Sequence, residues 1–341
     1  DFDRYNLYDY SYTSSISDFS RSHWNQFAKD ITEEYGSSLG LIVEIGSNDG
    51  YLLQQLKPFS QEIIGIDSSE EMSRIANSYG VRTLHTTFDS ESSKTISKKH
   101  GKADLVIANN VLNHSNDPVD FVKGVWNLLS DDGFFIFEVP YWSNTVTSLH
   151  FDQIYHEHVS YLTVRSVKTL LEKVGMAISQ ISVVDYHGGS LRVAAVKGRP
   201  LHQSKEVEKF LVNEDELKLC DPKTYTEYVD LVTRKRSIFL SKIHEIMSES
   251  VSHPIVGVGA AAKANTLLTY YGLNHSYLRF ITDSSEHKIG KYTPFTRIPI
   301  VSDMQFASHS EITAVILSWN IGESLRASIK AINQNARFLE L

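Results

Sequence analysis

The sequence has little of several features that would each point to a definite class of protein. Its 341 residues include one cysteine, Cys220, so the chain can form no internal disulfide and no site built on several thiolates. No run approaches the ~18 apolar residues of a membrane-spanning helix. The chain begins without the basic and apolar segments of a signal peptide. These absences predict a cytoplasmic protein with no membrane partner and no bound metal.

Positive charge is also in short supply. The chain has 33 Lys and Arg residues against 41 Asp and Glu, which gives a formal net charge of −8, and it has no basic run. An acidic surface of this kind repels nucleic acid, so we expect no nucleic-acid partner. Hydrophobic residues make up 41% of the sequence, enough for a sizeable core. At roughly 150 residues per domain, the length favours two domains.

Short apolar runs alternate with helical patterns along most of the chain, which predicts βαβ units and a mainly parallel sheet. Strands are expected at 41–45, 63–67, 82–85, 103–109, 133–139, 177–185 and 191–197. A long helix is expected over 224–248, and a second βα series begins after Pro254. The expected fold is α/β, with a Rossmann-like domain followed by a smaller one. The predicted divisions are a Tyr/Ser-rich arm (1–22), a first domain (23–200), a helical connector (201–250) and a second domain (251–341).

A glycine loop, V-E-I-G-S-N-D-G at 43–50, joins the first strand to a helix, where open α/β sheets bind ligands. It is not a P-loop, because no Gly-Lys-Ser/Thr follows, and Asn48 stands at the second glycine position of a dinucleotide fingerprint. Glu44 and Asp49 would repel a pyrophosphate but suit a cation such as S-adenosylmethionine. Asp67, at the end of the second strand, suits the ribose hydroxyls. The alternative is an incidental βα turn.

Two further positions fit a donor of this kind. Phe88 and Asp89 follow the third strand, where an adenine ring needs an apolar platform and a polar partner. The pair Asn109 and Asn110 ends the fourth strand, at the usual rim of such a site. The predicted donor-binding residues are therefore Glu44, Gly46, Asn48, Asp49, Asp67, Phe88, Asp89, Asn109 and Asn110.

The densest chemistry lies in H-F-D-Q-I-Y-H-E-H-V-S-Y, residues 150–161. Three interpretations stay open. His156 and His158 could ligate a metal, the ring nitrogens could be satisfied structurally, or a histidine could act as an acid or base with a carboxylate to orient it. In a regular strand Glu157 would face away from His158, so the third interpretation predicts irregular backbone here.

A second glycine loop, G-V-G-A-A-A-K at 257–263, matches G-x-G-x-x-A and is followed by Asp283 at the end of the next strand. It could hold a dinucleotide, or the helix start with Lys263 could receive the diphosphate of a nucleotide-linked substrate. The loop with Lys291 and Tyr292 is a surface loop or a further contact. The H-G-G-S-L-R stretch ending in Arg192 is a β-turn, or backbone that approaches a ligand with anionic oxygens.

Six ordered motifs together resemble the deoxysugar C-methyltransferases: V-E-I-G-S-N-D-G-Y-L-L, A-N-N-V-L-N-H, I-Y-H-E-H-V-S-Y-L, H-G-G-S-L-R, G-V-G-A-A-A-K-A-N-T-L-L and G-K-Y-T-P…I-P-I. The similarity covers nearly the whole chain. It implies a class I methyltransferase-like first domain, S-adenosylmethionine as methyl donor, and a nucleotide-diphosphate keto-sugar as substrate.

The resemblance also implies a reaction and roles. A base removes the proton next to the keto group, and the enolate carbon attacks the methyl group. The base corresponds to His158, with Tyr155 and Glu157 assisting it. The candidate substrate-binding residues are Tyr10, Tyr12, His156, His187, Ser190, Arg192, Lys263, Lys291 and Tyr292.

One departure from the family is large. Its members usually begin with a small zinc-binding domain built on C-x-x-C pairs, and this chain has none. Asn113 stands where the family often has a small residue. Alternatives are an NAD-dependent sugar-nucleotide oxidoreductase or epimerase using the Gly257 loop, an O- or N-methyltransferase, and a catalytically silent donor-binding regulator. The oligomeric state stays open, a monomer included.

Overall fold

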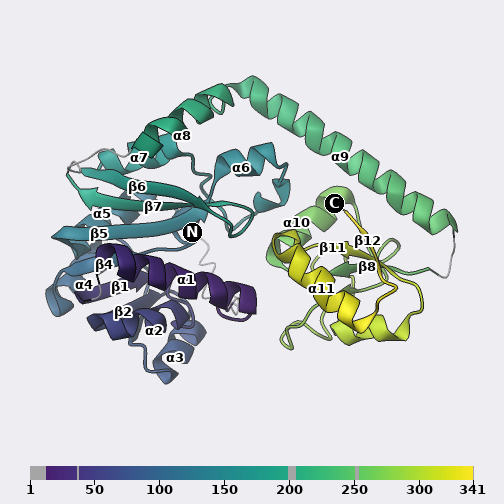
Figure 1. The fold of residues 1–341 in the computed structure, drawn as a ribbon, viewed down its shortest axis with the longest axis horizontal. Coiled ribbons are helices and arrows are strands. Elements are labelled where there is room, and N and C mark those ends of the chain that lie inside the picture. Colours follow the sequence, from purple (N-terminus) through teal and green to yellow (C-terminus); the bar gives the residue numbers. More distant parts are fainter. Residues whose placement is uncertain (1–12, 37, 199–204, 250–252, 341) are drawn as a thin grey trace. The chain divides into compact units, whose positions relative to one another are not determined.

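The computed structural model describes residues 13–36, 38–198, 205–249 and 253–340 and divides into two compact units (Figure 1). The first unit holds the described residues up to Asn144 together with Glu157–Lys218, and the second holds Thr145–His156 and the chain from Leu219 onward. The chain therefore enters the second unit twice. This division differs from the expected boundaries at 200 and 251, because the helix expected as a connector packs within the second unit.

The first unit alternates strands and helices. Its strands are β1 (Leu39–Ile45), β2 (Ser60–Asp67), β3 (Thr83–His85), β4 (Ala103–Ile107), β5 (Leu129–Pro140), β6 (Met176–Val184) and β7 (Ser190–Lys197). Its helices are α1 (Asp18–Tyr35), α2 (Tyr51–Leu56), α3 (Glu70–Ser78), α4 (Ser90–His100), α5 (Pro118–Leu128), α7 (Val164–Glu172) and α8 (Lys205–Glu216). Helix α6 (Trp142–Thr147) spans the point where the chain passes into the second unit.

The seven strands of the first unit form one sheet in the order β3-β2-β1-β4-β5-β7-β6. Strands β1 to β5 pair in parallel, and β7 is inserted antiparallel between β5 and β6. The order reverses between β1 and β4. The carboxyl edge at such a reversal is the usual ligand position in an open α/β sheet.

Alternate side chains of the central strands enter apolar cores on the two faces of the sheet. Val43 faces a core completed by α5 and α7, whereas Ile42 faces a core completed by α1 and α2 (Figure 1). The register sets Ile42 beside Leu105 and Val43 beside Val106. Burying each such side chain contributes about 1.5–3 kcal/mol, so both layers of helices hold the strand ends in place.

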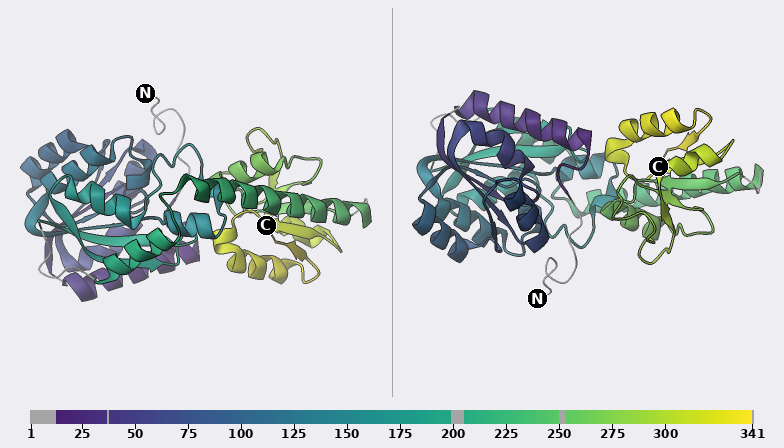
Figure 2. Two further views of the ribbon diagram at one scale, coloured as in Figure 1. Left: turned by 90° about the horizontal axis from the view of Figure 1, so that it is seen from above. Right: turned by 90° about the horizontal axis from the view of Figure 1, so that it is seen from below.

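The second unit is a smaller α/β structure. Its elements are α9 (Pro222–Glu249), β8 (Ile255–Val258), α10 (Ala262–Tyr271), β9 (Ile281–Thr282), β10 (Ile300–Val301), β11 (Thr313–Ile316), α11 (Gly322–Ile332) and β12 (Arg337–Leu339). The five strands are parallel, in the order β10-β9-β8-β11-β12. The long helix α9 runs alongside this sheet in both views of Figure 2 and packs on α10, where the Phe239 and Tyr271 ring centroids are 5.2 Å apart.

No helix within the described part of the chain is both long enough and apolar enough to cross a membrane.

Candidate active site

The loop after β1 is held tightly against the ends of β2 and β4. Gly46 has a φ of +68°, and a Cβ there would lie 2.3 Å from Cγ2 of Val111, in the loop after β4. The Gly46 backbone N–H donates to the Ile66 carbonyl over 2.7 Å. A side chain at this position would therefore be strained in φ and would push apart the loops after β1 and β4.

Three carboxylates gather in this loop region. Glu44, Asp49 and Asp67 are each less than one-tenth exposed, and none forms an ion pair with Lys or Arg among the described residues. Burial, with Asp49 and Asp67 nearby, raises the pKa of Glu44 well above its usual range, and burial also raises the pKa of Asp67. Oε2 of Glu44 is buried without a hydrogen-bond partner in the described structure. The site therefore has a free acceptor at Glu44, and a cationic ligand bound here would stabilise the ionised form of these carboxyl groups.

Asp67 also organises the loop itself. Its Oδ2 accepts the backbone N–H of Asn48 and its Oδ1 that of Ser69, both over 2.8 Å. The second unit repeats this arrangement with Asp283, which accepts the N–H groups of Ala260 and Ser285 over 2.8 and 2.9 Å. Asp283, however, has its own cation, Nζ of Lys288 at 3.2 Å. Of these two matching acids, only the one in the first unit lacks a lysine or arginine partner within the described residues.

The segment before α1 covers part of the glycine loop, which sequence reasoning missed. The Ser14 backbone N–H donates to Oδ1 of Asn48 over 2.8 Å, and the hydroxyls of Ser14 and Ser15 both donate to Asp49. No local signal marks these serines, because they lie more than thirty residues before their partners. Tyr10 and Tyr12, predicted to contact substrate, lie outside the described residues.

The candidates after β3 and β4 lie at the same edge of the sheet. Phe88 is half-buried against Phe121, with ring centroids 5.1 Å apart, while Asp89 is exposed and caps α4. Oδ1 of Asn109 accepts the N–H of Glu138 over 2.9 Å, which leaves its buried Nδ2 without a partner among the described residues. An unsatisfied amide here is a donor available to a ligand.

Backbone hydrogen bonds join the segment of the predicted base, His158, to the loop after β4. The backbone N–H groups of Val159 and Ser160 donate to the carbonyl of Asn113 over 2.9 and 3.0 Å. This places the His158 ring 5.2 Å, centroid to centroid, from that of His114, a residue absent from the predicted site. Residues 154–160 contain a bend and a turn at 155–157 and no strand, which is the irregular backbone that the acid–base interpretation predicts. The division between units falls between His156 and Glu157, so Tyr155 and His156 belong to the second unit.

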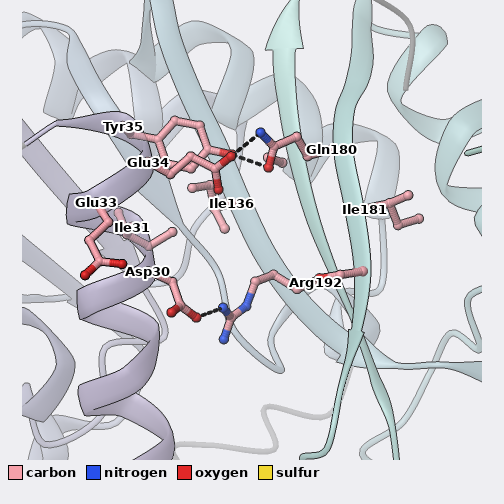
Figure 3. Close-up of a pocket in the computed structure, with 11 residues that line it drawn as sticks. Asp30, Ile31, Glu33, Glu34, Tyr35, Ile136, Gln180, Ile181 and Arg192 are labelled. Carbon is pink, nitrogen blue, oxygen red and sulfur yellow. Dashed lines mark hydrogen bonds and ion pairs between the residues drawn. The ribbon is translucent and has the colours of Figure 1, made fainter. Parts of the chain in front are cut away.

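A buried ionic network surrounds the side chain of Glu138 in β5. Its side chain is fully buried and contacts Nε2 of His23 over 2.8 Å and Nε of Arg192 over 2.7 Å. Nη1 of Arg192 reaches Asp30 over 2.7 Å, beside a pocket between α1 and strands β5–β7 (Figure 3). Two carboxylates thus engage the guanidinium that was predicted to bind substrate oxygens, which argues against that role.

The H-G-G-S turn joins β6 to β7 as a hairpin. His187 has a φ of +54°, and its ring lies 4.1 Å from that of Tyr186. A Cβ on Gly189 would lie 2.0 Å from Nδ2 of Asn144, so protein rather than ligand approaches this glycine. The Ser190 hydroxyl is fully buried and donates to the Tyr186 carbonyl over 2.9 Å. These contacts favour the β-turn interpretation for Ser190.

The predicted substrate-binding residues of the second unit differ in exposure. Lys291 and Tyr292 are exposed in the loop between β9 and β10. Lys263 is half-buried, with Nζ 4.1 Å from the centroid of the Trp319 ring. Searching the described residues for three or more His, Cys, Asp or Glu side chains placed to hold a metal finds no such group.

Two family models together match almost all of the chain. A methyltransferase domain matches residues 21–181, and a C-methyltransferase C-terminal domain matches residues 185–339. The C-methyltransferase NovU of Streptomyces niveus is 31% identical over 333 residues, covering 97% of this chain and 79% of that protein. The chain belongs to the C-methyltransferase family. The predicted resemblance is thereby confirmed at the level of C-methyl transfer.

Solved structures match about half of the chain at low identity. The plantazolicin methyltransferase BpumL in complex with SAH is 15% identical with a TM-score of 0.42, covering 53% of this chain and 85% of its own. A magnesium protoporphyrin IX methyltransferase from Synechocystis PCC 6803 is 14% identical with a TM-score of 0.40, covering 52% and 79%.

The strand order and the family together confirm the expected fold, a class I methyltransferase-like domain with a second, smaller Rossmann-like domain. The chain is an S-adenosylmethionine-dependent C-methyltransferase, so the expectation of a methyltransferase enzyme is confirmed as well. The oxidoreductase and the O- or N-methyltransferase were the alternatives, and family membership favours neither.

Proposed function

We propose that this C-methyltransferase methylates a nucleotide-activated keto-deoxysugar at the carbon next to the carbonyl, with His158 as the base. The observation that carries the proposal is the attachment of the His158 segment to Asn113 in the loop after β4. That loop also touches the donor loop, through Val111 against Gly46. These contacts support a proposed base and a proposed donor site at one edge of the first unit.

The residues at the ends of β1, β2, β3 and β4 and in the loops that follow them suit S-adenosylmethionine. Its sulfonium and ammonium groups are cations, and Glu44, Asp49 and Asp67 are carboxyl groups without a lysine or arginine partner in the described structure, so a bound cation would stabilise their ionised form. The free oxygen lone pairs of Asp67 suit the ribose hydroxyls, and Phe88 with Asn109 would hold the adenine side of the donor. When bound, the donor supplies an electrophilic methyl group.

In this mechanism the residues of the chain remove one proton from the substrate. His158 takes the proton from the carbon beside the carbonyl, and the resulting enolate carbon forms the new carbon–carbon bond as the donor's carbon–sulfur bond breaks. Glu157, next to it in the same unit, would orient the ring, and Tyr155 would donate to the enolate oxygen. His156, His187, Lys291 and Tyr292 remain the candidates for contacts with the sugar nucleotide, where exposed Lys291 offers charge to a diphosphate.

Methyl-transfer assays test the substrate. We expect incorporation of a labelled methyl group from S-adenosylmethionine into a panel of nucleoside-diphosphate keto-sugars, with NMR placing the methyl on carbon. With S-adenosylhomocysteine in place of the donor, the enzyme should still exchange the proton next to the carbonyl for deuterium. Methyl groups found on oxygen, or methylation by an enzyme that catalyses no exchange, would contradict the enolate route.

Donor affinity should depend on pH. Because burial raises the pKa of Glu44 and of Asp67, these groups take up protons as the pH falls, and protonation removes the charge that binds a cation. S-adenosylmethionine should therefore bind more tightly as pH rises through these pKa values, by up to about tenfold per pH unit for each linked proton. Calorimetric titrations across pH should show a smaller slope for S-adenosylhomocysteine, which lacks the sulfonium charge. Equal slopes would argue that the carboxylates do not face the sulfonium.

A further inference from the structure

At the carboxyl edge of the second sheet, the loops after β8 and β11 pack closely against each other. Strand order reverses between β8 and β11, which is where open α/β sheets bind nucleotides. Gly259, in the loop after β8, has a φ of +89°, and a Cβ there would lie 2.3 Å from Oγ of Ser318, in the loop after β11. The short turn Phe151–Gln153 packs on α10, with the Phe151 ring centroid 4.8 Å from that of Tyr270.

Trp319, which follows Ser318, is contacted on both faces and at its edge. The His150 ring stacks on it with centroids 3.7 Å apart and an interplanar angle of 24°. Nζ of Lys263 lies 4.1 Å from the same ring centroid, and since His150 covers one face, the ammonium group lies over the other. The indole N–H donates to Oδ2 of Asp152 over 2.7 Å. All four residues belong to the second unit.

The indole of Trp319 contacts an acidic group, Asp152, and a basic group, Lys263. Asp152 is 2% exposed, and burial raises its pKa while Lys263 and the indole hydrogen bond act to lower it. Burial lowers the pKa of Lys263 to about 8, against the opposing effect of Asp152. The other polar and charged groups facing the cluster are His150 beside it in the chain, Tyr228, Lys235 and Arg236 of α9, and Tyr270 and Tyr271 of α10.

We propose that Asp152 is a positioning residue for methyl transfer: held by the indole N–H of Trp319, it fixes the turn from which the chain runs into Tyr155. This inference rests on the proposed function, in which Tyr155 assists the base. Three residues of chain span at most about 10 Å, so a displaced turn moves Tyr155 with it. The glycine loop of the second unit, in this role, holds the chain's own catalytic segment rather than a dinucleotide.

The first test needs no substrate. The chain has four tryptophans, so four indole N–H resonances are expected in a ¹H–¹⁵N spectrum, and Trp319→Phe identifies one of them. In the wild-type enzyme that resonance should shift with a midpoint near pH 8, following Lys263. Asp152→Asn should move it and lower the midpoint, since the carboxylate stabilises the ammonium, whereas Lys263→Arg should abolish the titration.

The second test follows catalysis. Asp152→Asn should lower kcat about 10- to 100-fold, as a misplaced assisting group does, with the donor Kd within about twofold of wild type. Activity should fall as the pH rises through about 8, where Lys263 loses its proton and Asp152 its counter-charge. In Asp152→Asn this decline should be absent, because no carboxylate remains to need the ammonium group, and in Lys263→Arg it should move to higher pH. If Asp152 acted only in folding, neither substitution would change the pH dependence of kcat.

A matched control comes from the same unit. Glu340→Gln removes an exposed carboxylate that pairs with Arg326, and it should leave kcat, the pH profile and the indole resonance at wild-type values. An Asp152→Asn enzyme with wild-type kcat, or a Trp319 resonance that Asp152→Asn does not move, overturns the positioning role whatever the substrate. A wild-type enzyme that methylates no keto-sugar in the panel overturns the proposed function, while the indole titration still decides the cluster.

Discussion

His158→Asn should lower kcat by about 10³-fold, because general-base catalysis typically contributes 10²- to 10⁴-fold. Asparagine keeps a polar side chain in the turn but cannot accept the proton, so deuterium exchange beside the carbonyl should be lost in parallel. The donor Kd should stay at its wild-type value, since the Asn113 contacts that hold this segment come from backbone groups. Single-turnover methyl transfer, exchange followed by NMR and calorimetric donor titration measure the three quantities.

The control is His244→Asn, on the exposed face of α9, where the ring contacts only the hydroxyl of Tyr277 among the described hydrogen bonds. It should leave all three quantities unchanged. If His158→Asn binds donor and still exchanges deuterium at the wild-type rate, another group is the base, and His114, 5.2 Å away, becomes the first to test. Normal donor binding with no turnover would also exclude a catalytically silent regulator, which has no need of this histidine.

The parts of the fold that depend on local pattern could be predicted from sequence. The apolar runs at 41–45 and 63–67 lie within β1 and β2, and the helical period over 224–248 lies within α9. Asp67 follows from the same logic, since parallel strands bring their carboxyl ends to one edge. Helix α4 has no such pattern: Ile96 is its only buried apolar residue, and a capping box between Asp89 and Ser92 defines its start.

The rest of the site depends on partners far apart in sequence. Glu138 meets His23 across 115 residues and Arg192 across 54, so no local spacing could show that Arg192 is neutralised within the fold. The same holds for Lys263, whose position in the first turn of α10 suggests a phosphate contact from sequence alone. Its actual neighbours, Asp152 and Trp319, come from segments on either side in the chain. Sequence indicates which residues carry chemistry, and packing decides which of them remain available to a ligand.

Asp67→Asn should weaken S-adenosylmethionine binding roughly 10- to 100-fold, since hydrogen bonds to a charged group contribute about 1.5–3 kcal/mol and each 1.4 kcal/mol is tenfold. Two losses combine in this variant. The ribose loses a charged acceptor, and the amide nitrogen of asparagine would face one of the two backbone N–H groups, of Asn48 or Ser69, that the carboxylate now accepts. Donor titration by calorimetry, with thermal unfolding to confirm the folded state, measures the effect.

Asp283→Asn is the matched control, because that carboxylate accepts two backbone N–H groups in the same way but lies in the other unit. The neighbouring Lys288 already balances its charge, so nothing in its surroundings calls for a cationic ligand. Its variant should therefore bind the donor as wild type does, even if the loop after β8 loosens. Equal weakening in both variants would show that the loss is not specific to Asp67, and wild-type affinity in Asp67→Asn would remove Asp67 from the donor site. A loss confined to Asp67→Asn would show that the unpaired acid, rather than the shared loop geometry, selects the donor.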